Sequence, residues 1–164
     1  KKTVEDISVS ILTFVYITVA LSSVIVVREA SFDFIWYIFI FAWATDTCAY
    51  FAGFAFGKHK LMPKVSPKKT IEGAIGGIIG CIIISTVYAY FVHPEYILLI
   101  GVSALIGSVI SQAGDLFASS FKRKLGVKDY GNLIPGHGGM LDRIDSIIFT
   151  APFTYIVMFI AKLI

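Results

Sequence analysis

The chain has 164 residues, of which 57% are hydrophobic and only 15% are charged. Its mean hydropathy is +0.82, whereas a water-soluble domain usually has about 25% charged residues. The composition therefore excludes an ordinary soluble domain and indicates an integral membrane protein, for which we expect membrane lipids and no nucleic acid as partners.

Five apolar stretches are long enough to cross a hydrocarbon core, which takes about 20 helical residues. We expect helices rather than barrel strands, because the stretches are too long for strands and lack a two-residue alternation. The predicted fold is an all-α, polytopic integral membrane helix bundle of about five transmembrane helices. The expected spans lie near Ile7–Val27, Phe34–Phe56, Ile71–Val92, Tyr96–Phe121 and Ser146–Ile164.

The cations are distributed unevenly among the connections between these spans. Of the 14 Lys and Arg residues, all except Arg28 and Lys162 fall in segments 1–6, 57–70 and 122–145. With five spans, these segments share one side of the membrane, and an excess of cations marks the cytoplasmic side. We therefore expect a multi-pass protein with a cytoplasmic N-terminus and an outside C-terminus, in the cell inner membrane if the source is bacterial.

Small residues in the second and third spans predict close helix packing, because they follow the small-xxx-small spacing of membrane helices. These residues are Gly53, Gly57, Gly73, Gly76, Gly77 and Gly80. We interpret Cys48 and Cys81 as small core residues rather than a disulfide. The glycine-rich faces are also compatible with a homodimer.

Four aspartates fall inside the spans or near their predicted cytoplasmic ends. Asp46 lies near the middle of the second span. An ionised carboxylate at that depth in a membrane costs about 2.5–3.5 kcal/mol and typically faces a polar interior. Asp115 lies about 10 Å along the fourth span from its inner boundary, and Asp142 and Asp145 precede the fifth. Asp115 and Asp142 are thus expected at neighbouring helix ends, where hard oxygen ligands favour Mg²⁺. Capping of the fifth helix is the alternative role for Asp142 and Asp145.

The segment from residue 119 to residue 145 interleaves cations, carboxylates and glycines. Cations suit phosphate groups, and glycines allow a backbone to approach a ligand closely. The pattern is Ser119-x-Phe121-Lys122-Arg123-x₄-Lys128-Asp129-x-Gly131-x₂-Ile134-Pro135-x-His137-Gly138-Gly139-Met140-x-Asp142-Arg143-Ile144-Asp145. It resembles the signature of phosphatidate cytidylyltransferases, also called CDP-diacylglycerol synthases. The segments 44–50, around Asp46, and 66–73 agree, so the resemblance extends from about Trp36 to Pro152.

The resemblance implies transfer of the cytidylyl group of CTP to phosphatidate, which gives CDP-diacylglycerol and pyrophosphate in phospholipid biosynthesis on the cytoplasmic side. It implies that Asp115 and Asp142 hold Mg²⁺, and it is compatible with a second cation, such as K⁺, lined by Asp46. His137 would donate a hydrogen bond or protonate the leaving group. The catalytic residues implied are Asp115, Asp142, His137, Lys128 and Arg143.

The implied substrate-binding residues divide between nucleotide and lipid. Lys68, Lys69, Lys128 and Arg143 would bind the triphosphate or pyrophosphate, whereas Lys122 and Arg123 would bind the phosphatidate head group. The other substrate-binding positions are Thr70, Ser119, Asp129, Gly138, Gly139 and Asp145. Family members usually have additional N-terminal membrane helices, so we expect residues 1–164 to be one transmembrane catalytic domain and a fragment of a longer protein.

Two other classes of protein share parts of this pattern. A cation-coupled membrane transporter would also contain intramembrane carboxylates such as Asp46 and Asp115. That function predicts a polar path through both leaflets, whereas the charges here gather on one side. A phosphotransferase that uses CDP-activated alcohols would carry an Asp-rich helix signature, which the sequence lacks.

Overall fold

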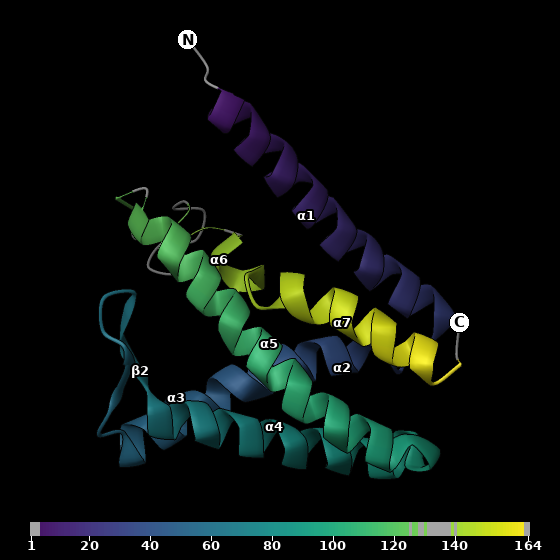
Figure 1. The fold of residues 1–164 in the computed structure, drawn as a ribbon. Coiled ribbons are helices and arrows are strands. Elements are labelled where there is room, and N and C mark those ends of the chain that lie inside the picture. The colour runs from purple at the N-terminus through teal and green to yellow at the C-terminus, as the bar shows by residue number, and fades with distance from the viewer. Residues whose placement is uncertain (1–3, 125, 128–129, 131–138, 140, 163–164) are drawn as a thin grey trace.

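The structure is a computed structural model that describes residues 4–124, 126–127, 130, 139 and 141–162. Its helical elements are α1 (Val4–Ala30), α2 (Ile35–Phe39), the π-helical segment η1 (Ile40–Ala44), α3 (Thr45–Phe56), α4 (Ile71–Val92), the 3₁₀ turn η2 (Pro94–Tyr96), α5 (Ile97–Lys124), α6 (Leu141–Ile144) and α7 (Ile147–Ile160). Strands β1 (Lys60–Met62) and β2 (Ser66–Thr70) form a short antiparallel hairpin. The helices confirm the predicted all-α, membrane-type bundle (Figure 1).

Four stretches of the described chain are long and apolar enough to cross a membrane. They are Thr13–Ala30, Ile35–Phe56, Ile71–Val92 and Pro94–Lys124. The apolar helix α7 has 14 residues, which makes it about 21 Å long, shorter than a hydrocarbon core of about 30 Å. The predicted fifth span is therefore shorter than expected, because the chain turns at Asp145 and Ser146 and the helix ends at Ile160.

The bundle is held together by three main helix pairs: α3 with α4, α4 with α5, and α1 with α7. The first pair depends on glycine. A Cβ atom at Gly77 would lie 2.9 Å from the Thr45 carbonyl oxygen, and one at Gly73 would lie 2.8 Å from the Ala49 carbonyl oxygen. These contacts confirm that the glycines serve helix packing. The two cysteines are free thiols, as predicted.

The π-helical segment η1 interrupts the second long span directly before Asp46. Two threonine hydroxyls satisfy backbone carbonyls around it. Thr45 Oγ1 donates to the Phe41 carbonyl oxygen at 2.6 Å, and Thr150 Oγ1 from α7 donates to the Ile38 carbonyl oxygen at 3.2 Å. Wide turns of this kind are frequent at functional sites, and this one sets where α3 begins.

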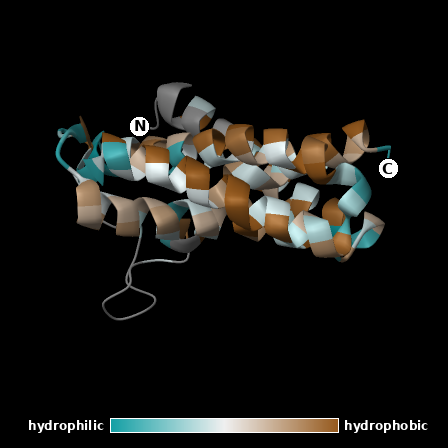
Figure 2. Cartoon of the chain, turned by 90° about the horizontal axis from the view of Figure 1, so that it is seen from below, coloured by the Kyte–Doolittle hydropathy of each residue, from teal (hydrophilic) through white to brown (hydrophobic). Residues whose placement is uncertain are grey.

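The bundle has two chemically different ends. The hairpin end contains β1, β2, α6 and the C-terminal end of α5 (Figure 1). The aromatic end contains a cluster of rings, Phe34, Tyr37, His93 and Tyr96. Hydrophilic residues concentrate towards the ends of the bundle, and hydrophobic stretches lie between them (Figure 2). The described residues of segments 57–70 and 122–145, for which the sequence predicted the site, therefore lie at the hairpin end.

Candidate active site

The hairpin carries Lys68 and Lys69 on β2, directly before α4. A two-stranded hairpin is only marginally stable by itself, and here α4 fixes it. The Glu72 carboxylate accepts hydrogen bonds from the backbone N–H groups of Lys58 at 3.0 Å and His59 at 3.2 Å. The His59 ring Nδ1 also lies 2.6 Å from Glu72. The lysines are thereby held at a defined place relative to α4.

Thr70 joins the hairpin to α4. Its backbone is extended, and its hydroxyl accepts a hydrogen bond from the Gly73 N–H at 3.1 Å. This is the geometry of an N-cap, which satisfies one of the unpaired N–H groups of the first helical turn. The Thr70 hydroxyl, predicted to bind substrate, therefore also fixes the start of α4.

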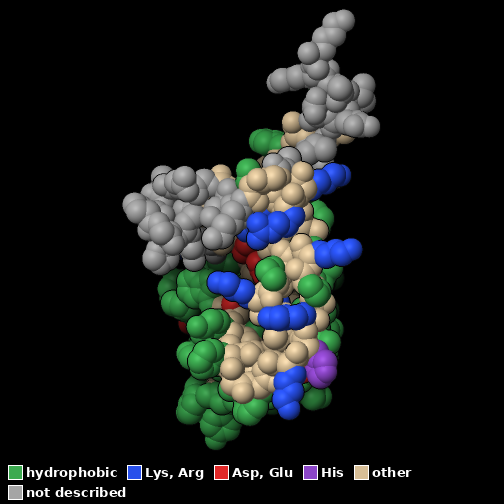
Figure 3. All heavy atoms as spheres, turned by 90° about the vertical axis from the view of Figure 1, so that its left-hand side faces the viewer, with side chains coloured by type: hydrophobic (Ala, Val, Ile, Leu, Met, Phe, Trp, Pro, Cys, Tyr) green, Lys and Arg blue, Asp and Glu red, His purple; other side chains and the backbone are tan. Residues whose placement is uncertain are grey.

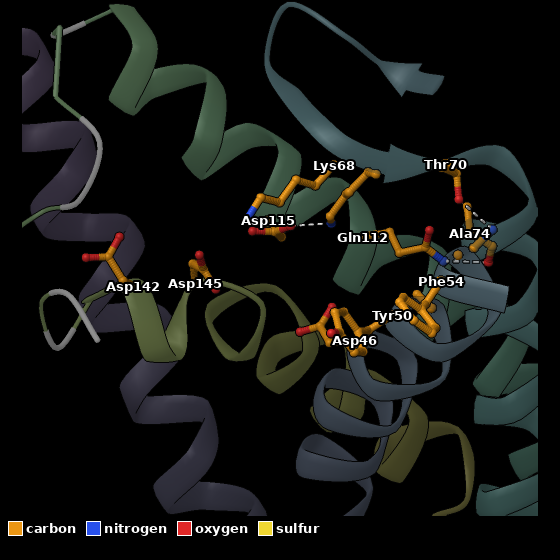
Figure 4. A pocket seen from close by; sticks show the side chains of 14 residues that line it. Asp46, Tyr50, Phe54, Lys68, Thr70, Ala74, Gln112, Asp115, Asp142 and Asp145 are labelled. Atoms are coloured by element: carbon orange, nitrogen blue, oxygen red, sulfur yellow. Dashed lines mark hydrogen bonds and ion pairs between the residues drawn. The ribbon is translucent and has the colours of Figure 1, made fainter. Parts of the chain in front are cut away.

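A cavity of about 440 Å³ opens at the hairpin end. Its walls come from α3, β2, α4 and α5, together with the chain around α6. Side chains that sequence reasoning assigned to separate segments converge on it (Figure 4). The charged lining residues are Asp46, Asp115, Asp142, Asp145, Lys68 and Lys69. Together with Thr70, seven of the predicted site residues thus share one cavity.

Asp115, on α5, forms an ion pair with Lys69 from β2. The two side chains are 23% and 26% exposed, so the pair belongs to the cavity wall. Gln112 lies one helical turn earlier, and its side-chain amide donates to the Ala74 carbonyl oxygen at 3.2 Å. This hydrogen bond fixes α5 against α4 close to Asp115.

Among the residues that the structure describes, Asp142 accepts more hydrogen bonds than the other carboxylates of the cavity. Its Oδ1 accepts from Lys122 Nζ at 2.8 Å, and its Oδ2 accepts from the backbone N–H groups of Tyr130 and Gly139, each at 2.9 Å. Burial alone would raise the pKa of Asp142, but these hydrogen bonds together lower it below its ordinary value. Asp142 thus links α5 to the chain before α6. The capping alternative required Asp142 to contact the N-terminus of α7 instead.

Asp145 lies between α6 and α7. Its Oδ1 accepts from the Ser146 backbone N–H at 2.8 Å, and its Oδ2 lies 4.0 Å from Lys122 Nζ. Burial, followed by the negative charge of Asp115, raises the pKa of Asp145 to about 6. The neighbouring charge of Asp46 acts in the same direction. Crowded carboxylates of this kind are stabilised by an added positive charge.

Asp46 is exposed because it faces the cavity. It lies in the first turn of α3, about 16 Å along the helix from Gly57. Ser146 Oγ donates a long hydrogen bond to Asp46 Oδ2 at 3.4 Å, which connects the start of α7 to α3. Asp46 therefore has the polar surroundings that were predicted for it, because it lines the charged cavity.

The donor chemistry of the cavity fits Mg²⁺. Within the ranges that the structure describes, no three His, Cys, Asp or Glu side chains already converge as a metal site. Mg²⁺ in phosphate-binding sites, however, commonly takes one or two carboxylates and completes its shell with water and substrate phosphates. Asp115, Asp142 and Asp145 offer such ligands from one cavity. That Asp115 and Asp142 share an ion stays a prediction, because each now contacts a different lysine.

The cations of the hairpin end divide into inward and outward groups. Lysine and arginine side chains gather on this face, and acidic side chains are visible between them (Figure 3). Lys122 is only 9% exposed and points to Asp142, with its ammonium 5.3 Å from the centre of the Tyr130 ring. Arg123 is exposed and donates to the Val65 carbonyl oxygen at 3.4 Å. The two neighbours in sequence therefore have different surroundings.

Several predicted positions contribute less to the described site. Ser119 is half-buried on α5 and does not line the cavity. Gly139 contributes its backbone N–H, which donates a hydrogen bond to Asp142. The predicted residues Lys128, Asp129, His137 and Gly138 lie outside the described residues, and so does the side chain of Arg143.

Sequence reasoning missed three residues that shape the site: Gln112, Tyr130 and Ser146. Gln112 offered a signal, because it is an amide in an apolar span one turn before Asp115. Ser146 follows Asp145 directly, but its contact with Asp46 depends on how α7 packs against α3. The contact between Tyr130 and Lys122 depends on the path of the chain, which spacing does not give.

Comparisons with known proteins show the family of this chain. The model of the "Cytidylyltransferase family" matches residues 1–161. A phosphatidate cytidylyltransferase of Staphylococcus haemolyticus (strain JCSC1435) is 42% identical over 154 residues, which cover 93% of this chain and 59% of the relative. One from Bacillus subtilis (strain 168) is 39% identical over 163 residues, which cover 95% of this chain and 60% of the relative.

This chain thus spans about three fifths of the length of the curated relatives it matches. Because the family match extends over nearly the whole sequence, the chain belongs to the cytidylyltransferase family.

Proposed function

We propose that the protein transfers the cytidylyl group of CTP to phosphatidate, giving CDP-diacylglycerol and pyrophosphate. The observation that carries this proposal is the gathering of four aspartates and two lysines in one cavity at the end of a membrane-type bundle. Membership of the family supports the nucleotide, and the relatives named phosphatidate cytidylyltransferase support the lipid.

The proposed reaction joins two anions. An oxygen of the phosphatidate phosphate attacks the α-phosphorus of CTP and forms a new P–O bond. The bond from that phosphorus to the oxygen bridging the β-phosphate breaks, and pyrophosphate leaves with the electron pair. Catalysis then consists mainly of neutralising repulsion and positioning the groups in line. A general base is unnecessary, since the second pKa of a phosphate monoester is about 6.

Mg²⁺ is the cofactor that we propose, held by Asp115 and Asp142, with Asp145 between them in the view of Figure 4. When bound, Mg²⁺ would offset the triphosphate charge and stabilise the charge that develops at the α-phosphorus. To hold the ion, Asp115 would release Lys69, and Asp142 would give up some of its present hydrogen bonds. Asp46, deeper in the cavity, would line a second cation such as K⁺.

Lys68 and Lys69 would bind the triphosphate. Lys68 is exposed at the cavity, and Lys69 is paired with Asp115. When CTP enters, Lys69 would exchange a carboxylate for a phosphate, so that its charge stays compensated throughout. Lys128, Arg143 and the His137–Gly139 segment are proposed to contact the pyrophosphate portion.

The lipid phosphate would lie near Lys122 and Arg123. An ammonium group has three N–H donors, and Lys122 uses one of them in its short contact with Asp142. Lys122 would therefore contact the phosphate while Asp142 keeps it in place. The hairpin end would face the cytoplasm, because most cations lie in the segments that meet there. A homodimer is also proposed, with an interface other than the glycine-rich faces, because these pack α3 against α4.

A nucleotide panel tests the proposed function. The full-length protein in lipid nanodiscs receives CTP, dCTP, UTP or ATP together with phosphatidate and Mg²⁺, and the liponucleotide product is measured. We expect CDP-diacylglycerol from CTP, and none when phosphatidate is omitted or Mg²⁺ is chelated. Absence of liponucleotide from every nucleotide, combined with cation uptake into proteoliposomes, would instead support the transporter alternative.

A further inference from the structure

A second cavity, of about 370 Å³, lies between α1, α5 and α7. We call it the apolar groove. Its walls are mainly aliphatic and aromatic, and its size falls within the range of small-molecule sites. An aromatic cluster forms much of the wall: the Phe149 ring centre lies 5.1 Å from that of Tyr16 and 5.9 Å from that of Phe117. Ile17 of α1 lies on the wall contributed by that helix.

The apolar groove adjoins the charged cavity. Asp145 lines both. Tyr130 also lines the groove: its hydroxyl donates to the Ala118 carbonyl oxygen at 3.2 Å, and its ring faces the ammonium of Lys122. One end of the groove therefore meets a carboxylate and a buried cation, whereas the rest presents hydrocarbon.

This combination matches an amphipathic ligand. A wholly apolar ligand would leave the polar end of the groove unused, and a free nucleotide would place charge against aromatic rings. The groove is also bordered by helices that are apolar enough to span a membrane, since Thr13, Tyr16 and Ile17 belong to the α1 span and Phe117 to the α5 span. Phe117 is 54% exposed, so the groove is accessible from the side of the bundle.

We infer that the apolar groove holds the acyl chains of the phosphate-bearing glycerolipid, with the lipid phosphate at the Lys122–Asp145 boundary between the two cavities. The inference rests on the proposed function and adds a location to it. Nucleotide and lipid then approach from opposite sides of Asp145, and the reacting phosphates meet beside it. Residues of α1 that line the groove set lipid affinity without contacting CTP.

The test fills the groove at a residue outside the charged cavity. Ile17→Trp places a large ring in the groove, and Ile25→Trp is the matched control, because Ile25 lies on the same helix, is 57% exposed and does not line the groove. Both variants are made in the full-length protein in phosphatidylcholine nanodiscs. A phosphatidate carrying a photoactivatable diazirine in one acyl chain reports binding, and the KM values for phosphatidate and CTP report turnover.

We expect crosslinks on the α1, α5 and α7 peptides that line the groove, and we expect Ile17→Trp to reduce them at least fivefold while Ile25→Trp leaves them unchanged. Ile17→Trp should raise the KM for long-chain phosphatidate about tenfold and leave the KM for CTP unchanged. Crosslinks elsewhere that are insensitive to Ile17→Trp would overturn the inference. It would equally be overturned if an Ile17→Cys variant crosslinked to another segment of the protein or to a second copy.

The crosslinking arm does not depend on turnover. If the wild-type protein makes no liponucleotide but the diazirine lipid still labels the groove in an Ile17-dependent manner, the proposed reaction fails and the lipid site stands. If liponucleotide forms while the groove is unlabelled, the reaction stands and the lipid site fails.

Discussion

The two ends of the bundle differ in the side chains that they bring together: aromatic rings at one end and carboxylates at the other. At the aromatic end, Phe34 and Tyr37 are fully buried, their ring centres are 4.9 Å apart, and the Tyr37 hydroxyl is hydrogen-bonded to His93. The rings there pack against one another, and the Tyr37 hydroxyl has its hydrogen bond within the cluster. At the hairpin end, burial and then the negative charges of Asp115 and Asp46 raise the pKa of Asp145 to about 6. Apolar packing would not place carboxylates together, so the difference points to ligand binding at the hairpin end.

The largest expected effect is on enzymatic activity, which should depend on the hairpin end and not on the aromatic end. We predict that Asp115→Asn lowers cytidylyl transfer at least about 100-fold, because a charge-stabilising contact in phosphoryl-type transfer is lost. Asp33→Asn is the control and should leave turnover unchanged, because the exposed Asp33 directly precedes Phe34 at the aromatic end. The comparison fails if folded Asp115→Asn protein keeps wild-type rates of liponucleotide formation, or if the two variants lose activity equally.

The next effect concerns the division between lipid and nucleotide. Lys122→Ala should raise the KM for phosphatidate about tenfold, the effect of losing one charge-assisted contact of about 1.4 kcal/mol, and should change the KM for CTP much less. Lys124→Ala is the control, since Lys124 lies in the same last turn of α5 but is exposed. Equal changes in both KM values would assign Lys122 a general electrostatic role.

A smaller effect should appear in stability. The pKa of Asp145 in the folded protein, about 6, is above its ordinary value of 3.8. The protonated form therefore stabilises the fold below about pH 4, and this contribution disappears as the pH rises through 6. At pH 8, Asp145→Asn should raise the free energy of unfolding by up to about 3 kcal/mol.

Thermal unfolding in detergent, measured without nucleotide or metal, checks this prediction. The gain in unfolding temperature should shrink as the pH falls to 4, and Asp33→Asn should show no such trend. A gain for Asp145→Asn that is the same at pH 4 and pH 8 would contradict the charge crowding.

The smallest effect tests the aromatic end. Tyr37→Phe removes the 3.3 Å hydrogen bond to His93 while keeping the ring. We predict a loss of about 1 kcal/mol in the free energy of unfolding, with unchanged turnover. A large loss of activity in a variant that remains folded would mean that the aromatic end takes part in the chemistry.

The long helices were predictable because apolar length is a strong signal. The third span was placed at Ile71–Val92, the bounds that α4 has. The hairpin was not predicted, because Ser66–Thr70 contains Pro67 and two lysines and shows no alternation of apolar residues. The π-helical segment was missed because its residues are as apolar as those of an ordinary helix. The turn between α6 and α7 was missed because the fifth span was placed from Ser146 onward by its apolar length alone.

The site was predictable to the level of which carboxylates converge. Asp115 and Asp142 were expected at one end of the bundle from their positions along the spans, whereas Asp46 was expected near the middle of its span and joined the site through the family resemblance. The three line one cavity. Their immediate partners were not predictable, because the Lys69–Asp115 pair requires the hairpin to fold over α5. The Lys122–Asp142 pair likewise requires the chain after α5 to return to it.

The most direct test of the central claim measures the metal itself. Mn²⁺ replaces Mg²⁺, and electron paramagnetic resonance gives its affinity for the full-length protein in the presence of CTP, for wild type, Asp115→Asn, Asp142→Asn and Asp33→Asn. The shared-ion arrangement predicts at least about tenfold weaker Mn²⁺ binding in each of the first two variants and no change in Asp33→Asn. Wild-type affinity in either Asp115→Asn or Asp142→Asn would contradict it.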